Sequence, residues 1–205
     1  MIENQEIDFR QELLRKGIHL CSLSMPIFYS FYGSRLTLYF IIPMTFISLF
    51  IDVFSRKGYF LHDHFNKFFG SMMREHEKGT RFNLNGASWV LLSACIVFLI
   101  FPKHVAISAF SILIISDTFA AIVGRAFGRI KFLQKSLEGS MAFILSAAAV
   151  VYYVYWFYGL DQKFLTDGLW AAIAAGFVEA ISRELGLDDN IAIPMTFGWV
   201  MLFLQ

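Results

Sequence analysis

Seven apolar stretches alternate with shorter polar segments along the chain. Each stretch is long enough, or nearly long enough, to cross a bilayer as a helix, which takes about 20 residues. The pattern therefore predicts an all-α fold, a polytopic transmembrane helical bundle of about seven spans that forms a single domain over residues 1–205. The predicted spans are residues 17–32, 36–54, 86–101, 105–127, 137–158, 168–183 and 190–205.

The composition agrees with a membrane protein. The chain is 57% hydrophobic and only 16% charged, whereas soluble domains carry about 25% charged residues. Cys21 and Cys95 both lie in apolar segments, which favours reduced, buried cysteines over a disulfide scaffold. A net charge of +1 gives no sign of a nucleic-acid partner, and we expect none. So compact a chain fits a bacterial inner (cytoplasmic) membrane.

Basic residues are distributed unevenly between the two sides that seven spans would create. With a cytoplasmic N-terminus, fourteen of the seventeen basic residues fall on the inner side, and only Arg35, Lys103 and Lys163 fall outside. Because cytoplasmic loops carry an excess of Lys and Arg, this asymmetry predicts that the N-terminus is cytoplasmic.

The longest polar segment, residues 58–85, contains "YFLHDHFNKFFGSMMREHEKGTRFN". Its apolar residues follow helical spacing, which predicts an amphipathic helix in the inner headgroup region or a cytoplasmic helix packed on the bundle. His62, His64 and His76 lack the partners that zinc needs, so we predict no metal there. Asn83 and Asn85 precede the third span; we favour a capping role for them over contact with a nucleotide base.

Two acids lie inside predicted spans. A lone carboxylate at a helix centre costs about 2.5–3.5 kcal/mol to insert, so Asp117 should face the protein interior. Small residues share its helical face and allow a backbone or a ligand to approach: Ala121, Gly124 and Gly128. The sixth span repeats this arrangement with Glu179, Ala172 and Gly176, and both acids should lie at similar depth.

Two carboxylates at one depth repel each other unless they are protonated or bridged by a cation. Further oxygen ligands follow directly in "GLDDN". A hard divalent ion, for which magnesium fits best, would be held by Asp117, Glu179, Asp188 and Asp189, with Asn190 beside them. The alternative is that Glu179 pairs with Arg183 and that Asp117 bonds to a neighbouring hydroxyl.

The segment after Asp117 gathers cations in front of a new helix. Four basic residues fall within eleven positions: Arg125, Arg129, Lys131 and Lys135. Ser136 is placed to cap the next helix, Glu138 lies in its first turn, and Gly139 permits close approach to the free amides. These amides and a mobile Lys135 predict a phosphate site. A polyphosphate beside a metal indicates transfer of a phosphoryl or nucleotidyl group.

These residues resemble a known family. "DTFAAIVGRAFGRIKF", "KSLEGSMAFILS", "FVEAISRELGLDDNIAIP" and the early "ELLRKGIHL" are similar to segments of the dolichol kinase, phytol kinase and CTP-dependent diacylglycerol kinase family. The resemblance implies a polytopic enzyme that uses CTP, with a divalent metal, to phosphorylate a lipid alcohol. Dolichol kinases are much longer, so the chain resembles only their catalytic core.

The residue patterns and the resemblance together predict roles for individual residues. Catalytic roles fall to Asp117, Lys135, Glu138 and His19. Nucleotide or phosphate contacts fall to Arg15, Lys16, Gly124, Arg125, Gly128, Arg129, Lys131, Ser136, Gly139, Ser140 and Asn190. His19 would contact phosphate or activate the acceptor hydroxyl; the alternative for it is a structural hydrogen bond.

Two other functions are open to such a chain. A phosphatidate cytidylyltransferase would carry an acid-rich stretch with a Lys-Asp pair and a Gly-Gly-x-x-Asp-Arg segment, which this sequence lacks. A small transporter would spread its acids across the membrane, whereas these lie towards one surface. The acceptor, whether polyprenol, phytol-like alcohol or diacylglycerol, is left open. The small-residue faces could also serve a homodimer.

Overall fold

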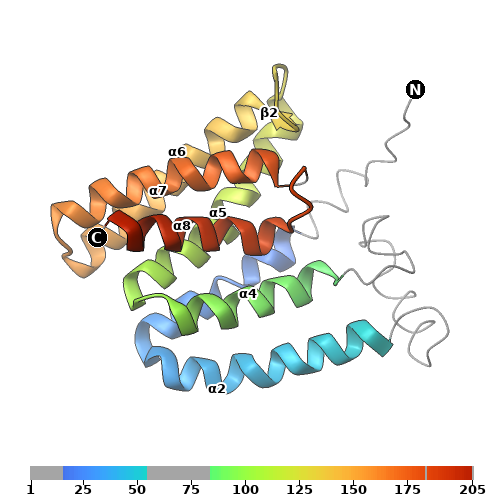
Figure 1. Cartoon of the computed structure of the whole chain (residues 1–205), viewed down its shortest axis with the longest axis vertical. Coiled ribbons are helices and arrows are strands. Elements are labelled where there is room, and N and C mark those ends of the chain that lie inside the picture. The colour runs from blue at the N-terminus through green and yellow to red at the C-terminus, as the bar shows by residue number, and fades with distance from the viewer. Residues whose placement is uncertain (1–15, 55–83, 183, 205) are drawn as a thin grey trace.

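The computed structural model describes residues 16–54, 84–182 and 184–204, which form a bundle of helices with one short β-hairpin. Four of the predicted features lie outside the described residues: Arg15, Asn83, Arg183 and the amphipathic part of 58–85 with its histidines. Figure 1 shows that the helices lie roughly side by side along one common direction.

The helices follow the apolar stretches of the sequence. Residues 16–21 are helical, and the longer helices are α2 (Ser24–Phe54), α4 (Gly86–Ile100), α5 (Lys103–Phe127), α6 (Leu137–Tyr158), α7 (Gln162–Ile181) and α8 (Asp189–Leu204). Four stretches of the described chain are long and apolar enough to cross a membrane, namely Lys16–Phe54, α5, α6 and α7, whereas α4 and α8 are shorter apolar helices. The protein is an all-helical integral membrane protein.

Helix α2 is broken at Gly33. This residue has φ 75° and ψ 179°, which are not helical angles and which are open essentially to glycine alone. In Figure 1 the blue part of the chain before this residue and the cyan part after it run in opposite directions. Gly33 therefore turns one long apolar stretch into a helical hairpin.

Two ends of the bundle differ in chemistry. At one end, here called the charged end, lie Lys16, Asp117, Lys135, Glu179 and Asp189, which form buried and partly buried ion pairs. At the opposite end, called the aromatic end, the Tyr158 hydroxyl contacts Ser30, the His104 ring lies 4.5 Å from the Tyr158 ring and Lys103 Nζ lies 5.8 Å from it. In Figure 1 the charged end is at the right and the aromatic end at the left.

The connections at the aromatic end are short. Gly33 is the one non-helical residue inside α2, Phe101 and Pro102 join α4 to α5, and residues 159–161 join α6 to α7. Gly159 has φ 60° and ends α6 in the left-handed conformation typical of a helix C-terminus. Each turn therefore returns the chain directly into the next helix.

The predicted spans match the helices closely, and 137–158 coincides with α6. The largest difference is α7, which begins at Gln162 rather than at residue 168 because Asp161 caps it by accepting the Phe164 N–H at 2.9 Å. This first part of α7 is polar, and hydropathy alone does not detect it.

Small residues let α5 and α6 approach closely near the charged end. A Cβ added to Gly139 would lie 3.0 Å from the Ala120 carbonyl oxygen and 3.1 Å from Gly124 Cα. A Cβ on Gly128 would lie 2.7 Å from Ser136 Oγ. The small-residue face beside Asp117 is thus approached by a neighbouring backbone, which is one of the two possibilities that its composition allowed.

A two-stranded hairpin joins α5 to α6, and the sequence analysis did not anticipate it. Strand β1 (Lys131–Phe132) pairs antiparallel with β2 (Lys135–Ser136), and Leu133 at the turn has a positive φ of 52°. The Phe132 ring lies 6.4 Å from the Phe177 ring of α7. This contact holds the hairpin against α7 and places Lys135 over the C-terminal part of that helix.

Helix α4 is joined to the second half of α2 by polar contacts. Ser48 and Ser88 share a hydrogen bond of 2.9 Å, and Thr45 Oγ1 lies 3.1 Å from Cys95 Sγ. Asn85 caps α4 as predicted, since its side chain accepts the Ser88 N–H. The buried Asp52 accepts the Asn85 N–H at 2.8 Å. These bonds satisfy polar groups that lipid could not solvate.

Candidate functional site

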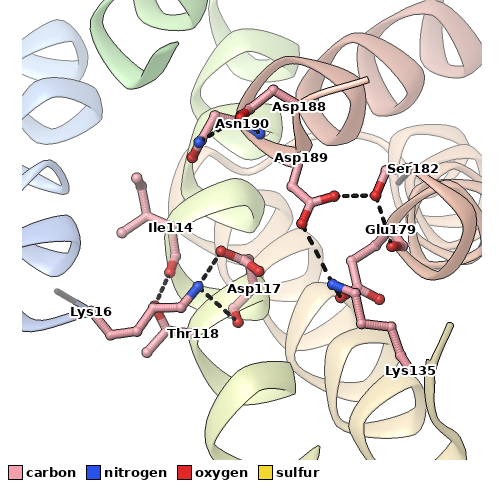
Figure 2. A network of polar contacts seen from close by, with 10 residues as sticks. All are labelled: Lys16, Ile114, Asp117, Thr118, Lys135, Glu179, Ser182, Asp188, Asp189 and Asn190. Carbon is pink, nitrogen blue, oxygen red and sulfur yellow. Dashed lines mark hydrogen bonds and ion pairs between the residues drawn. The ribbon is translucent and has the colours of Figure 1, made fainter. Parts of the chain in front are cut away.

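The buried Lys16 and the partly buried Lys135 organise the charged end, and Figure 2 shows them on either side of the acidic residues. Lys16 Nζ contacts Asp117 Oδ2 and also donates to the Asp117 carbonyl oxygen at 3.3 Å. Only 5% of the Lys16 side chain and 13% of the Asp117 side chain are exposed. Lys16 therefore neutralises the acid of α5 from a helical segment 101 positions earlier in the chain.

The partner of Asp117 corrects one expectation. A neighbouring hydroxyl was the alternative partner, but the Thr118 hydroxyl donates to the Ile114 carbonyl oxygen at 2.7 Å. Asp117 instead forms an ion pair with the Lys16 ammonium group. It also lies within electrostatic range of Lys135 and His19. Buried carboxylates are commonly paired in this way because an isolated charge is costly in a low-dielectric interior.

Lys135 forms the second network. Its Nζ lies 2.5 Å from Glu179 Oε1 and 3.4 Å from Asp189 Oδ2, so that one ammonium group joins the hairpin to α7 and α8. Two carboxylates hold the amine that we expected to act as a mobile point charge, and its mobility stays a prediction. Glu179 is 2% exposed, and its second oxygen, Oε2, has no hydrogen-bond partner among the described residues.

The charge of Lys135 is secured by its surroundings. Burial opposes the charged form, but the carboxylates of Asp189, Glu179 and Asp117 outweigh it and raise the pKa of Lys135 above its usual value. The side chain is consequently an ammonium group at any physiological pH. It is the kind of fixed positive charge that binds a phosphate group.

Asp189 is oriented by a residue that the sequence analysis missed. The buried Ser182 hydroxyl contacts Asp189 Oδ1 and lies 3.2 Å from the Glu179 carbonyl oxygen. A serine at the end of an apolar helix has no local signal for this role. The neighbouring Asp188 instead orders the start of α8, because its Oδ1 accepts the Asn190 N–H at 2.9 Å and the Asn190 side-chain amide at 2.7 Å.

The four carboxylates expected to bind metal are divided between different partners. Among the residues that the structure describes, no three His, Cys, Asp or Glu side chains are grouped so as to hold a metal ion. Asp117 is taken by Lys16, and Asp188 by Asn190. Glu179 and Asp189 alone converge on one cation, the Lys135 ammonium. Two carboxylates fit magnesium, which commonly uses one or two of them with substrate phosphates.

The N-terminus of α6 lies next to this network. Ser136 caps the helix as predicted by accepting the Gly139 N–H at 3.1 Å. The Glu138 carboxylate turns back to the loop and accepts the N–H groups of Arg129 at 3.0 Å and Ile130 at 3.3 Å. Glu138 thereby fixes the loop that carries the basic side chains.

The remaining predicted residues lie around the same end. Arg125, Arg129 and Lys131 are exposed on the loop and hairpin. Ser140 is buried on the first turns of α6, and its hydroxyl has no partner among the described residues. Gly124, Gly128 and Gly139 serve the close packing of α5, α6 and the Ser136 cap. His19 follows Lys16 by one turn on the same short helical segment.

Comparison with known proteins relates the chain to lipid kinases. The chain is 32% identical to the CTP-dependent diacylglycerol kinase 1 of Schizosaccharomyces pombe, with 69% of this chain and 68% of that protein covered. It is 32% identical to an uncharacterized protein of Rickettsia prowazekii over 93% of both chains. It is 34% identical to a probable chloroplastic phytol kinase of Triticum aestivum, covering 59% of this chain and 44% of that protein. No family model and no solved structure matches.

Proposed function

The chain belongs to the family of CTP-dependent diacylglycerol, phytol and dolichol kinases, and from this we propose that it transfers the γ-phosphoryl group of CTP to the hydroxyl of a membrane lipid alcohol. It is an integral membrane lipid kinase. One observation carries the proposal: two lysines and three carboxylates, all buried or partly buried, form ion pairs at one end of an otherwise apolar bundle. Such groups are costly in a membrane and mark a functional site.

The proposed topology has seven spans and a cytoplasmic charged end. Three features support it: the reversal of α2 at Gly33, the near match of the helices to the seven apolar stretches, and the segregation of the ion pairs from the Ser30–Tyr158 contact. The basic-residue asymmetry favours the charged end as the cytoplasmic one. Residues 1–205 would then act as a single catalytic domain, which we place in a bacterial inner membrane.

The charged end suits a nucleoside triphosphate. In our proposal the Lys135 ammonium group binds the phosphates, and Lys16, which stays paired with Asp117, adds positive charge nearby. The loop cations Arg125, Arg129 and Lys131, with Arg15, attract the nucleotide to the surface. Glu179 and Asp189 would hold a magnesium ion with Asp117 near them; the ion, when bound, would neutralise charge on the phosphate oxygens. Asn190 follows Asp189 in the chain, and Ser140 lies in the capped first turns of α6 that follow Lys135, so we assign both to the same site.

The proposed step is a displacement at phosphorus. The lipid hydroxyl oxygen forms a bond to the γ-phosphorus, the bond from that phosphorus to the β–γ bridging oxygen breaks, and CDP leaves with the electron pair. The hydroxyl proton passes to His19, one turn from Lys16 and within electrostatic range of Asp117. The acceptor reaches the site laterally from the bilayer; it belongs to the polyprenols, the phytol-like alcohols or the diacylglycerols.

The test follows the label of each phosphate. Purified protein in detergent is incubated with magnesium and CTP labelled at the α or the γ phosphate, together with a polyprenol, phytol, diacylglycerol and phosphatidic acid. We expect the γ label to enter one of the alcohols and the Asp117→Asn protein to lose this transfer. Transfer of the α label to phosphatidic acid would instead identify a cytidylyltransferase, and no transfer from CTP or ATP would reject the proposal.

A further inference from the structure

Lys135 occupies the point on which two carboxylates converge. Its Nζ lies 2.5 Å from Glu179 Oε1 and 3.4 Å from Asp189 Oδ2, and Figure 2 shows the three side chains meeting from the hairpin, α7 and α8. Ser182 fixes the other oxygen of Asp189. The two acids are thus held in place by different helices around a single positive charge.

The Lys135 ammonium group does not satisfy every carboxylate oxygen around it. Glu179 is 2% exposed, and its Oε2 has no hydrogen-bond partner among the described residues. A buried carboxylate oxygen without a donor is costly, and it indicates that the site can provide for a ligand other than the one it holds. A hard divalent cation accepts several oxygen ligands, whereas a lysine offers only three donors on one nitrogen.

We propose that Lys135 Nζ is a placeholder for the divalent cation between Glu179 and Asp189, and that it moves to the nucleotide phosphates when the cation binds. Metal and nucleotide then bind as a pair because each exchange keeps every buried charge neutralised. Metal alone would leave the partly buried Lys135 ammonium group without its two carboxylate partners, and nucleotide alone would leave two carboxylates facing phosphates. The proposal rests on the proposed use of CTP and adds how the site admits it.

The two lysines differ in the freedom that such an exchange requires. The Lys135 side chain is 21% exposed and is carried by a two-residue strand next to a turn, and a lysine stem is flexible enough to redirect its charge. Lys16 is 5% exposed and also contacts a backbone carbonyl. Lys135 is therefore the lysine suited to change partners, while Lys16 keeps Asp117.

The proposal is tested with Mn²⁺ as the metal probe, whose free concentration is measured by electron paramagnetic resonance. In the wild-type protein without nucleotide we expect weak binding, tightened at least tenfold by CTP after correction for the Mn²⁺ that the same CTP concentration binds without protein. In the Lys135→Met protein without nucleotide we expect Mn²⁺ to bind at least tenfold more tightly than in the wild type. Lys163→Met, the same substitution at the aromatic end, should leave Mn²⁺ binding unchanged. Adding Glu179→Gln to Lys135→Met should remove the gain.

Equal Mn²⁺ affinity of the wild-type and Lys135→Met proteins would overturn the proposal. If Lys135→Met does not fold, as judged by gel filtration in detergent, the wild-type titrations decide alone, and absence of any effect of CTP on Mn²⁺ binding refutes the idea. The label-transfer experiment is independent of these titrations. If the protein transfers the γ label but Mn²⁺ binding shows no exchange, the proposed function stands and only the placeholder role of Lys135 is refuted.

Discussion

The charged end and the aromatic end solve the same problem with different chemistry. Both must join helices that are distant in sequence: Lys16 reaches Asp117 and Lys135 reaches Glu179 at one end, whereas Ser30 contacts Tyr158 at the other. The aromatic end uses hydroxyl groups and packed rings, which are well tolerated at a membrane interface. The charged end uses full charges, which cost several kcal/mol each to desolvate.

The difference indicates what each end is for. If joining helices were the only task, hydroxyls and rings would suffice at both ends, as Tyr158 shows. A lysine or a carboxylate in an ion pair can change its partner for a phosphate or a metal ion, whereas the ring contact provides no charged group for either ligand. Under the proposed function, the charged pairs lie where the nucleotide and the metal ion would bind, and the uncharged contacts lie where the helices are only held together.

The largest effect should come from Asp117→Asn. This change leaves the Lys16 ammonium buried without a counterion and removes an acid from the site, so we expect phosphoryl transfer to fall at least about 100-fold and the free energy of unfolding to fall by about 3 kcal/mol. Transfer per folded molecule is measured after gel filtration. Asp161→Asn is the matched control, because asparagine caps a helix as well as aspartate. An equal loss of transfer in the Asp117→Asn and Asp161→Asn proteins would contradict the difference between the charged end and the aromatic end.

Gly139→Ala should have the next largest effect. The added Cβ would meet backbone atoms of α5 at 3.0 and 3.1 Å, so α6 must move and carry Ser136 and the hairpin with it. We expect about 2 kcal/mol of destabilisation and roughly tenfold lower transfer per folded molecule. Gly168→Ala meets only the Val151 side chain, at 2.5 Å. It should lower the melting temperature but leave transfer per folded molecule unchanged. Lower transfer in Gly168→Ala with unchanged transfer in Gly139→Ala would refute the distinction between the ends.

Ser182→Ala should act through Asp189 alone. Loss of the hydroxyl frees one oxygen of Asp189, and we expect about a fivefold higher KM for CTP with a smaller change in kcat. Ser182→Thr keeps the hydroxyl and should restore the KM. If Ser182 had a purely structural role, Ser182→Ala would lower the melting temperature and would not change KM more than kcat. An unchanged KM for CTP in Ser182→Ala would therefore show that Ser182 is not part of the site.

Tyr158→Phe should have the smallest effect. It deletes the hydroxyl that contacts Ser30 but keeps the ring against His104, so the free energy of unfolding should fall by about 1 kcal/mol and transfer should not change. Tyr155→Phe, which loses only an exposed 3.4 Å contact with Gln162, should be nearly neutral. A marked loss of transfer in Tyr158→Phe would show that the aromatic end also serves the reaction.

Local patterns predicted much of the fold. The limits of α6, the Ser136 and Asn85 caps and the position of Asp117 near the charged end all follow from apolar runs and capping chemistry. The pairings of Lys16 and Lys135 did not follow, because their partners lie 101 and 44 positions away and no local signal selects them. The β-hairpin was missed because "KFLQKS" contains no Asn-Gly or Asp-Gly turn.

Asp52 shows a signal that was present but not used. It interrupts "FISLFIDVF" just as Asp117 interrupts its own apolar run, and the structure buries it against the start of α4. An acid inside a predicted span should therefore always be treated as buried and paired. The role of Ser182, in contrast, could not be read from the sequence. Serines inside apolar helices more often bond to their own backbone, as Ser146 does with the Ala142 carbonyl oxygen.

The short turns at the aromatic end limit how the topology can be mapped. A folded reporter spliced at Gly33, between Ile100 and Lys103, or within residues 159–161 would have to push apart two adjoining helices. Fusion readings from these points would describe damaged protein, whichever side the reporter occupied. Small membrane-impermeant thiol reagents need no such space. Single cysteines at exposed positions such as Arg35 or Lys163, in a chain whose Cys21 and Cys95 are replaced, are thus the sounder way to establish which side that end faces.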